Sequence, residues 1–397
     1  MPPDQVAEVQ GLYGPFTLSE RVIQKIWLRQ DLTTENLKTA SGKSLVVKNP
    51  GRWNLQEGPD FKEAKLVLDG VEFVGDVEVH FNLSDWLHHQ HNTDKNFDRV
   101  LLHVVLYSDQ SGLPSPVRTS KGQVPELIHL MPLLKQDLES YALEDALLEL
   151  ERPNELEWVA DFLNYSPEER LHILMQRAKT RWRQKVTFAR QRLEAEGWEA
   201  ACHSYALEVL GYKRNRAPML RLAARYPLAQ MRKESALNAD ELFEEMRDDW
   251  KLNGLRPANH PRRRLAQYLE LVKEQPDWPQ KLKACLEMFP IDRLERKTAT
   301  FRKAVQLSKL RAEIDTSVFC LTIGKTRLDT LIVDAVLPLA AAVGLLDSVD
   351  YWLHWFPGDR PDSIQRFLKQ AEVMSRENPL SNGLIQGALG LFLEKGV

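Results

Sequence analysis

Three ionisable residues, Asp76, Glu78 and His80, lie at alternate positions at the end of one apolar segment, and Asp60 begins the segment before it. In a β-strand, residues at this spacing leave the backbone on the same side. Carboxylate oxygens are the ligands that Mg²⁺ and Mn²⁺ prefer, and imidazole exchanges a proton near neutral pH. The pattern predicts a metal site on one face of a sheet, unless these residues only line the solvent-facing side of a hairpin.

The turn between the two segments fixes how they pair. Asp69-Gly70 between two β-type runs is a strong hairpin signal. A two-residue turn there sets Glu63 opposite Asp76, where like charges destabilise a sheet. A bound cation would turn these clustered carboxylates from a cost into a set of ligands.

The same register pairs Lys62 with Val77 and Asp60 with Val79, which sends Asp60 to the apolar face of the hairpin. Gly58-Pro59 makes a regular strand unfavourable at that point. We therefore expect a bend or bulge over residues 59–61 that returns Asp60 to the face of Glu78.

Six of the ten histidines lie between His80 and His129, and the segment SDWLHHQHNTD contains His88, His89 and His91. The segment lacks HExxH spacing, and neighbouring histidines on irregular backbone rarely converge on one ion. We assign His89 and His91 to substrate contact or to hydrogen bonding around the site, with a zinc-dependent hydrolase built on these histidines as the weaker alternative. His103 lies within an apolar strand and is expected either to be a satisfied core residue or to bond to the site.

The elements that position these residues change character once along the chain. A helix is expected near residues 17–30, β-type runs dominate from about 44 to 130, and helical periodicity then continues to the C-terminus. We predict an α+β or α/β protein with a mixed-sheet domain at 1–130 and an all-helical domain of hairpins or a bundle at 131–397, subdivided near Gly254.

Composition limits the class of protein. The chain has 397 residues, 43% hydrophobic and 27% charged, with net charge −3 and three scattered cysteines. With no signal-like N-terminus and no uninterrupted apolar run of membrane-spanning length, we expect a cytoplasmic protein without membrane contact.

Charge is unevenly distributed, because residues 131–169 hold eleven acidic and two basic residues and residues 170–233 hold fifteen basic and four acidic ones. The two segments either pair with each other or present a surface for DNA or RNA. Four further basic residues at expected turns, which either contact phosphate or cap and pack helices, are Lys213, Arg214, Arg256 and Arg264.

Pro59-Asp60 followed by Glu78-Val79-His80 resembles the motif of the PD-(D/E)XK nuclease superfamily, and the expected elements follow its α-β-β-β-α-β core order. The resemblance implies a restriction-endonuclease-like sheet and metal-dependent cleavage of DNA or RNA. It implies that Asp60, Glu78 and the Val79 carbonyl bind Mg²⁺ or Mn²⁺, that His80 orients or deprotonates the attacking water, and that Glu20 adds a ligand. The motif expects lysine where this chain has His80, which leaves an inactive nuclease-fold scaffold that binds nucleic acid or protein as the alternative.

A second resemblance extends over nearly the whole chain. The blocks GPDF, GDVEVH, SDWLHHQH, LLHVV and GLRPANHPRRRL are similar to those of an uncharacterised bacterial family known as a domain of unknown function. That resemblance implies no particular activity.

Overall fold

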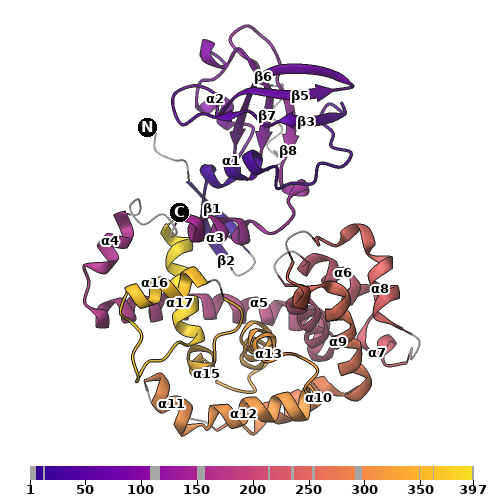
Figure 1. Cartoon of the computed structure of the whole chain (residues 1–397), viewed down its shortest axis with the longest axis vertical. Coiled ribbons are helices and arrows are strands. Elements are labelled where there is room, and N and C mark those ends of the chain that lie inside the picture. The colour runs from indigo at the N-terminus through magenta and orange to yellow at the C-terminus, as the bar shows by residue number, and fades with distance from the viewer. Residues whose placement is uncertain are drawn as a thin grey trace. The chain divides into compact units, whose positions relative to one another are not determined.

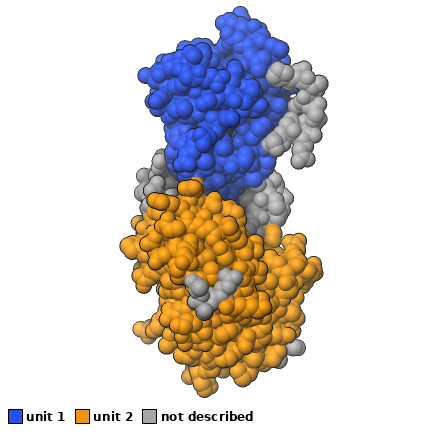
Figure 2. All heavy atoms as spheres, turned by 90° about the vertical axis from the view of Figure 1, so that its right-hand side faces the viewer, with its two compact units in different colours: residues 1–145, 396–397 blue, residues 146–395 orange. Residues whose placement is uncertain are grey.

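The computed structural model divides into two compact units, residues 1–145 with 396–397 and residues 146–395 (Figure 2). The boundary expected after residue 130 is earlier in the chain than this division after residue 145. It would fall before η2 (Met131–Leu133) and α3 (Leu138–Glu149). Gly254, near which a subdivision is expected, lies outside the described residues. The structure describes residues 6–11, 14–107, 117–149, 157–212, 215–233, 237–252, 255–290, 297–347, 349–360 and 362–395.

The first unit contains the expected mixed sheet, with strand order β3-β5-β6-β7-β8 and β4 paired with β5 (Figure 1). The pairs β3–β5 and β5–β6 are antiparallel, whereas β6–β7 and β7–β8 are parallel. A separate hairpin of β1 and β2 precedes α1, which packs against β6. The elements of this part are β1 (Val6–Gly11), β2 (Gly14–Ser19), α1 (Glu20–Arg29), β3 (Leu45–Asn49), β4 (Arg52–Trp53), β5 (Phe61–Leu68), β6 (Val71–His80), α2 (Asp85–His88), η1 (Lys95–Phe97), β7 (Val100–Val105) and β8 (Glu126–His129).

The hairpin of β5 and β6 turns at Asp69-Gly70, as the sequence predicts. Both residues have positive φ, 48° and 83°, as a type I′ turn requires. The expected register holds as far as Ala64 opposite Gly75, and then shifts so that Phe61, and not Lys62, faces Val77. The expected bulge therefore exists, but it lies after Phe61 and not over residues 59–61.

The bulge also changes the interpretation of Asp76. Glu63 has φ of 61°, its backbone N–H donates to Asp76 Oδ1 at 3.0 Å, and the residue is exposed. The repulsion expected between two opposed carboxylates is thus avoided without a cation, because Asp76 accepts a hydrogen bond from the bulge. The contact with the Glu63 backbone therefore accounts for the carboxylate at Asp76, and a metal is not needed to explain it.

The last part of β6 is buried on both faces. Asp76, Glu78 and His80 are 5%, 5% and 1% exposed, so the interpretation of a solvent-facing side is wrong here. A Cβ at Gly75 would lie 2.4 Å from Leu101 Cγ, which explains why glycine stands at this position of the strand. The register of β6 with β7 shifts directly after Asp76.

The second unit is helical, and its longest helix is α5 (Figure 1). Ser166 and Glu169 form a capping box at its start, Pro167 is its first residue, and Gly197 interrupts it with φ of 76°. Helices α6, α14 and α17 pack against α5. The helices are α4 (Glu157–Leu163), α5 (Pro167–Leu210), α6 (Arg216–Arg225), α7 (Leu228–Met231), α8 (Ala239–Glu245), η3 (Arg247–Asp249), η4 (Pro257–Asn259), α9 (Pro261–Glu274), α10 (Trp278–Glu287), α11 (Thr298–Ala304), α12 (Leu307–Glu313), η5 (Ile314–Val318), α13 (Lys325–Leu331), η6 (Ile332–Val336), α14 (Leu337–Ala342), α15 (Val349–His354), α16 (Asp362–Gln370) and α17 (Asn382–Lys395).

Several basic residues of α5 pair outside the acidic segment 131–169. Lys185 contacts Asp334 at 2.7 Å, and Arg192 contacts Glu208 at 2.7 Å. The thiols of Cys202 and Cys285 are buried, and Cys320 is partly exposed. Within the described residues, helices that combine the length and the apolar character needed to cross a membrane are absent.

Candidate metal centre

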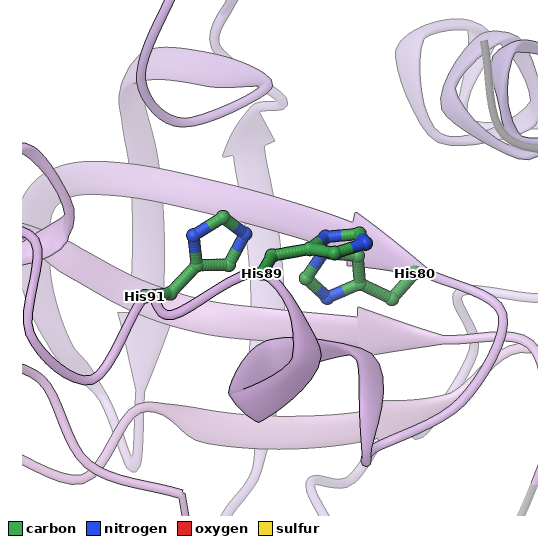
Figure 3. Close-up of side chains that lie close together, drawn as sticks. All are labelled: His80, His89 and His91. Atoms are coloured by element: carbon green, nitrogen blue, oxygen red, sulfur yellow. The ribbon is translucent and has the colours of Figure 1, made fainter. Parts of the chain in front are cut away.

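The end of β6 and the segment that follows it bring three histidines together. His80 is the last residue of β6, His89 follows the short helix α2, and His91 lies two residues further (Figure 3). Each offers one ring nitrogen to a group whose members all lie within 4.8 Å of one another. The three rings therefore surround one point beside the sheet.

A carboxylate oxygen lies against two members of this group. Glu78 Oε1 lies 3.4 Å from His80 Nε2 and 3.2 Å from His91 Nε2, and His80 Nε2 lies 3.1 Å from His89 Nδ1. The ligand atoms of a tetrahedral zinc ion, at bond lengths of about 2.0–2.2 Å, are separated by about 3.3–3.5 Å. These three contacts are close to that spacing. The side chains whose ligand atoms all lie within 4.8 Å of one another are the three histidines, and Glu78 lies against two of them, His80 and His91.

His91 is the member of the group that protein contacts explain least. It is 8% exposed, and among the described residues neither of its ring nitrogens has a hydrogen-bond partner. Its contact with Glu78 Oε1 is short but lacks hydrogen-bond geometry. A buried polar atom without a partner is costly, and a metal ion at this point would satisfy it.

Aromatic packing holds the segment of His91 in place. The His91 ring stacks on Phe97 with centroids 3.7 Å apart, and Trp86 packs edge-on against it at 5.4 Å. Trp86 is fully buried, and its indole N–H donates to the Arg118 carbonyl at 3.1 Å. The interpretation of Trp86 as the anchor of this segment agrees with these contacts.

His103 on β7 supports the cluster from behind. Its Nε2 lies 2.9 Å from His80 Nδ1, and its side chain is fully buried. If His80 Nε2 bound a metal, its Nδ1 would carry the proton and donate a hydrogen bond to His103 Nε2. That bond would fix the orientation of the His80 ring. Of the two roles expected for His103, bonding to the site is the one that this contact supports.

The electrostatics keep the histidines neutral. Burial lowers the pKa of His91 to about 4 and of His103 to about 3. Burial, together with the neighbouring histidines, lowers the pKa of His80 well below its ordinary value, and burial also lowers the pKa of His89. Near pH 7 the lone pairs that bind metals are therefore available.

Glu78 is affected in the opposite direction. Burial raises its pKa to about 8, against the effect of the hydrogen bond from the Asp60 backbone. In the metal-free protein it is mainly a neutral acid beside neutral imidazoles, and not half of an ion pair. A divalent cation would favour its carboxylate form.

Asp60 lies beside Glu78, as the nuclease-like motif requires. The Asp60 backbone N–H donates to Glu78 Oε2 at 3.0 Å, and Asp60 Oδ2 accepts from the Val79 backbone at 3.0 Å. Gln24 of α1 donates to Asp60 Oδ1 at 2.8 Å and accepts from the Trp53 indole at 3.1 Å. Each Asp60 oxygen thus already accepts one hydrogen bond.

The other candidate residues lie in different places. Glu20 is the buried first residue of α1, one turn before Gln24. Gln24, which bonds to Asp60, is not among the residues that the sequence pattern predicts for the site. Arg256 is exposed and Arg264 is buried, both in the helical unit. Lys213 and Arg214 lie outside the described residues.

The fold and the cluster define an α+β protein with a candidate nitrogen-rich metal centre in its sheet unit. The chain belongs to the family described as "Protein of unknown function (DUF2851)", whose model matches residues 20–243. The match extends from the start of α1 into α8 and includes Glu78 and the three histidines. Comparisons with curated proteins and with solved structures gave no match.

Proposed function

We propose that the sheet unit is a metal-dependent hydrolase of phosphodiester bonds in DNA or RNA, with the metal held by Glu78, His80, His89 and His91. The observation that carries this proposal is the convergence of three imidazole nitrogens within 4.8 Å of one another, with a Glu78 oxygen against two of the three rings. A purely structural role for these residues would not explain why the His91 ring is buried with no hydrogen-bond partner among the described residues.

The element order supports phosphodiester cleavage as the reaction. Helix α1, strands β3, β5 and β6, helix α2 and strand β7 follow the α-β-β-β-α-β order that the resemblance to PD-(D/E)XK nucleases implies, apart from the two-residue β4. Pro59-Asp60 directly precedes β5, Glu78-Val79-His80 ends β6, and hydrogen bonds join the two. Both parts of the motif thus meet beside the histidines.

The donor set favours zinc over the Mg²⁺ or Mn²⁺ expected from Asp60 and Glu78 alone. Magnesium prefers oxygen ligands, whereas three imidazoles and one carboxylate suit Zn²⁺. When bound, such an ion would lower the pKa of a coordinated water and polarise a phosphoryl oxygen. Mg²⁺ and Mn²⁺ at the two carboxylates remain the competing assignment.

The side chains of the protein divide the remaining work. His80 is almost fully buried, with both ring nitrogens against His89 and His103, so it is suited to hold and orient and not to exchange protons with solvent. His89 is only partly buried, and with one ring nitrogen on the metal its other nitrogen carries a proton that it can donate as a hydrogen bond to a substrate phosphate. Asp60 fixes the Glu78 carboxyl group through its backbone N–H.

Metal content and cleavage measured together test this proposal. The full chain is purified without added metal, analysed for Zn, Mn and Mg, and assayed on single- and double-stranded DNA and RNA with each ion. We expect one equivalent of bound Zn²⁺, and we expect His91→Ala to lose at least about tenfold in metal affinity, as outer-shell changes alone do. Cleavage should fall in parallel.

His88→Ala is the matched control, because His88 is in the same segment but its side chain is 73% exposed. Wild-type metal content in His91→Ala would overturn the histidine site. Mg²⁺-dependent cleavage that Asp60→Asn abolishes and His91→Ala leaves intact would support the two-carboxylate assignment instead. Metal and nucleic-acid binding without cleavage would support the inactive scaffold.

A further inference from the structure

Arg264, in the first turn of α9, is a buried cation that forms no ion pair of its own with any described residue. It is 6% exposed, and its guanidinium donates to two neutral groups, Gln267 Oε1 and Asn259 Oδ1, both at 2.9 Å. Among the described residues it has no ion pair, and its Nε has no acceptor. Arginine cannot escape this cost by losing its proton, so a missing anionic partner is the direct physical remedy.

A second buried arginine lies beside it. Arg327 of α13 is 4% exposed, and its Nη2 donates to the same Asn259 oxygen at 3.1 Å. It pairs with Asp359 at 2.9 Å, and its Nε is also buried without an acceptor within the described part of the chain. The two guanidinium groups thus share one neutral oxygen, that of Asn259. Asp359 is the one carboxylate among the described residues that forms an ion pair with either of them.

The surroundings add positive potential that reaches solvent. Arg256 and Arg263 are exposed and form no ion pair with any described residue, whereas Arg262 pairs with Asp240 at 3.0 Å and with Glu244 at 3.1 Å. The N-terminus of α9 has no side-chain cap, which leaves its first backbone N–H groups available. A helix N-terminus of this kind attracts anions.

We propose that the first turn of α9, with Arg264, Arg327 and Asn259, binds a phosphoryl group. Two guanidinium forks on one oxyanion need several acceptor oxygens pointing in different directions, which phosphate provides and a single carboxylate does not. Arg264, Arg327 and Asp359 together carry one net positive charge, which the single negative charge of a phosphodiester would neutralise. A doubly charged phosphate monoester would match both arginines and would also displace Asp359 from Arg327. The ligand is therefore a nucleic-acid backbone phosphate or a free phosphate compound.

This site is independent of the candidate metal centre. Arg264 and Arg327 lie in the helical unit and outside the residues that the family model matches. Of the four basic residues expected either to contact phosphate or to cap and pack helices, Arg264 and Arg256 are near this turn, and Arg327 is not among them. Loss of the metal centre should leave phosphate binding unchanged.

Phosphate titration of the full chain tests the proposal. At fixed ionic strength, inorganic phosphate should slow hydrogen exchange in peptides covering residues 255–267, and acetate should not. Arg264→Gln should weaken phosphate binding at least tenfold. Arg262→Gln, two residues before it and at a side chain already paired with carboxylates, should leave phosphate binding unchanged. Equal protection by acetate and phosphate, or equal affinity in Arg264→Gln and the wild type, would overturn the site.

Two further arms keep the result interpretable. Arg264→Lys retains the charge and serves if Arg264→Gln fails to fold, and it should also bind phosphate more weakly because lysine lacks the planar fork. A single-stranded oligonucleotide that protects the same peptides at lower concentration than a mononucleotide identifies the backbone as the source. Equal affinity for the two identifies a free phosphate compound.

Discussion

Two regions, the cluster around Glu78 in the sheet unit and the buried cations of the helical unit, bury ionisable groups in opposite ways. Around Glu78 the sheet unit gathers neutral forms, because burial lowers the pKa of His91 to about 4 and raises that of Glu78 to about 8. The helical unit buries groups that stay charged: Lys185 against Asp334, and Arg264 with a pKa lowered only to about 10. Both regions are polar and buried, but only the second holds permanent charge.

This difference explains which ligand each region requires. Neutral imidazoles with free lone pairs, beside an acid that can still ionise, attract a cation, and the protein is spared the cost of buried charge until that cation arrives. A buried guanidinium has no neutral form at physiological pH, so it must find an anion or tolerate the cost. The same degree of burial therefore leads to a metal centre in one unit and to an anion site in the other.

Lys185→Met should have the largest effect on this comparison. Lys185 Nζ lies 2.7 Å from Asp334 Oδ1, and its side chain is 2% exposed. Removing it leaves a largely buried carboxylate without its closest cation, which should cost about 4 kcal/mol of unfolding free energy. Denaturant unfolding, with hydrogen exchange of peptides from α5 and η6 to assign the loss, measures it.

The control for Lys185 is Arg183→Met on the same helix, since Arg183 is exposed and should change stability by no more than about 0.5 kcal/mol. The double variant Lys185→Met with Asp334→Leu should recover much of the loss, because both charges are then gone. Equal, small effects of Lys185→Met and Arg183→Met would show that the helical unit does not depend on its permanent charges.

Gly75→Ala should have the next largest effect, and in the sheet unit. A Cβ there would lie 2.4 Å from Leu101 Cγ and 2.8 Å from the Arg99 carbonyl oxygen, so β6 and β7 must move apart. We expect a loss of up to about 3 kcal/mol and weaker metal binding, because Glu78 and His80 lie on the displaced strand. Calorimetry with and without Zn²⁺ measures both.

Gly70→Asn is the comparison variant for Gly75, since Gly70 has open space around it and asparagine tolerates its positive φ. It should cost less than about 1 kcal/mol and leave metal binding intact. If Gly75→Ala binds Zn²⁺ as tightly as Gly70→Asn does, the cluster does not depend on the close approach of β7.

The fold was more accessible from the sequence than the site was. Asp69-Gly70 and alternating hydrophobicity predict the hairpin, and the expected bulge follows from the need to bring Asp60 to Glu78. The position of the bulge was missed because it depends on a hydrogen bond from Glu63 to the Asp76 side chain, across the hairpin. Alternation rules describe strands and cannot locate such a bond.

The convergence of His89 and His91 was expected only in the weaker alternative, for a related reason. Their position depends on Trp86 and Phe97, which anchor an otherwise irregular segment through tertiary packing. A buried tryptophan directly before closely spaced histidines was the available signal. For Arg264, the residue type suggested phosphate, but its burial without a counter-ion is a property of the folded structure alone.

The pH dependence of the sheet unit should show the smallest and most specific effect. Above about pH 7.5 His91 and His103 are almost fully neutral in both the folded and the unfolded states, because folding lowers their pKa values from an ordinary value of 6.5. Glu78 differs, because its pKa is about 8 in the folded protein against an ordinary value of 4.5. In this range the metal-free folded state still holds part of a proton that the unfolded state has lost, so stability must fall as pH rises.

Over the window from about pH 7.5 to about pH 8.5 this fall should reach on the order of 0.5 kcal/mol, read from hydrogen exchange of peptides covering β6 in the presence of a chelator. Below about pH 7.5 the histidines add the opposite slope, which is why the upper window isolates Glu78. Glu78→Gln should flatten the dependence, and Zn²⁺ should bind the wild type more tightly as pH rises, because the acid must lose its proton to become a ligand. An equal slope in Glu78→Gln would mean that the sheet unit does not keep its central acid neutral, and the contrast with the permanently charged helical unit would fail.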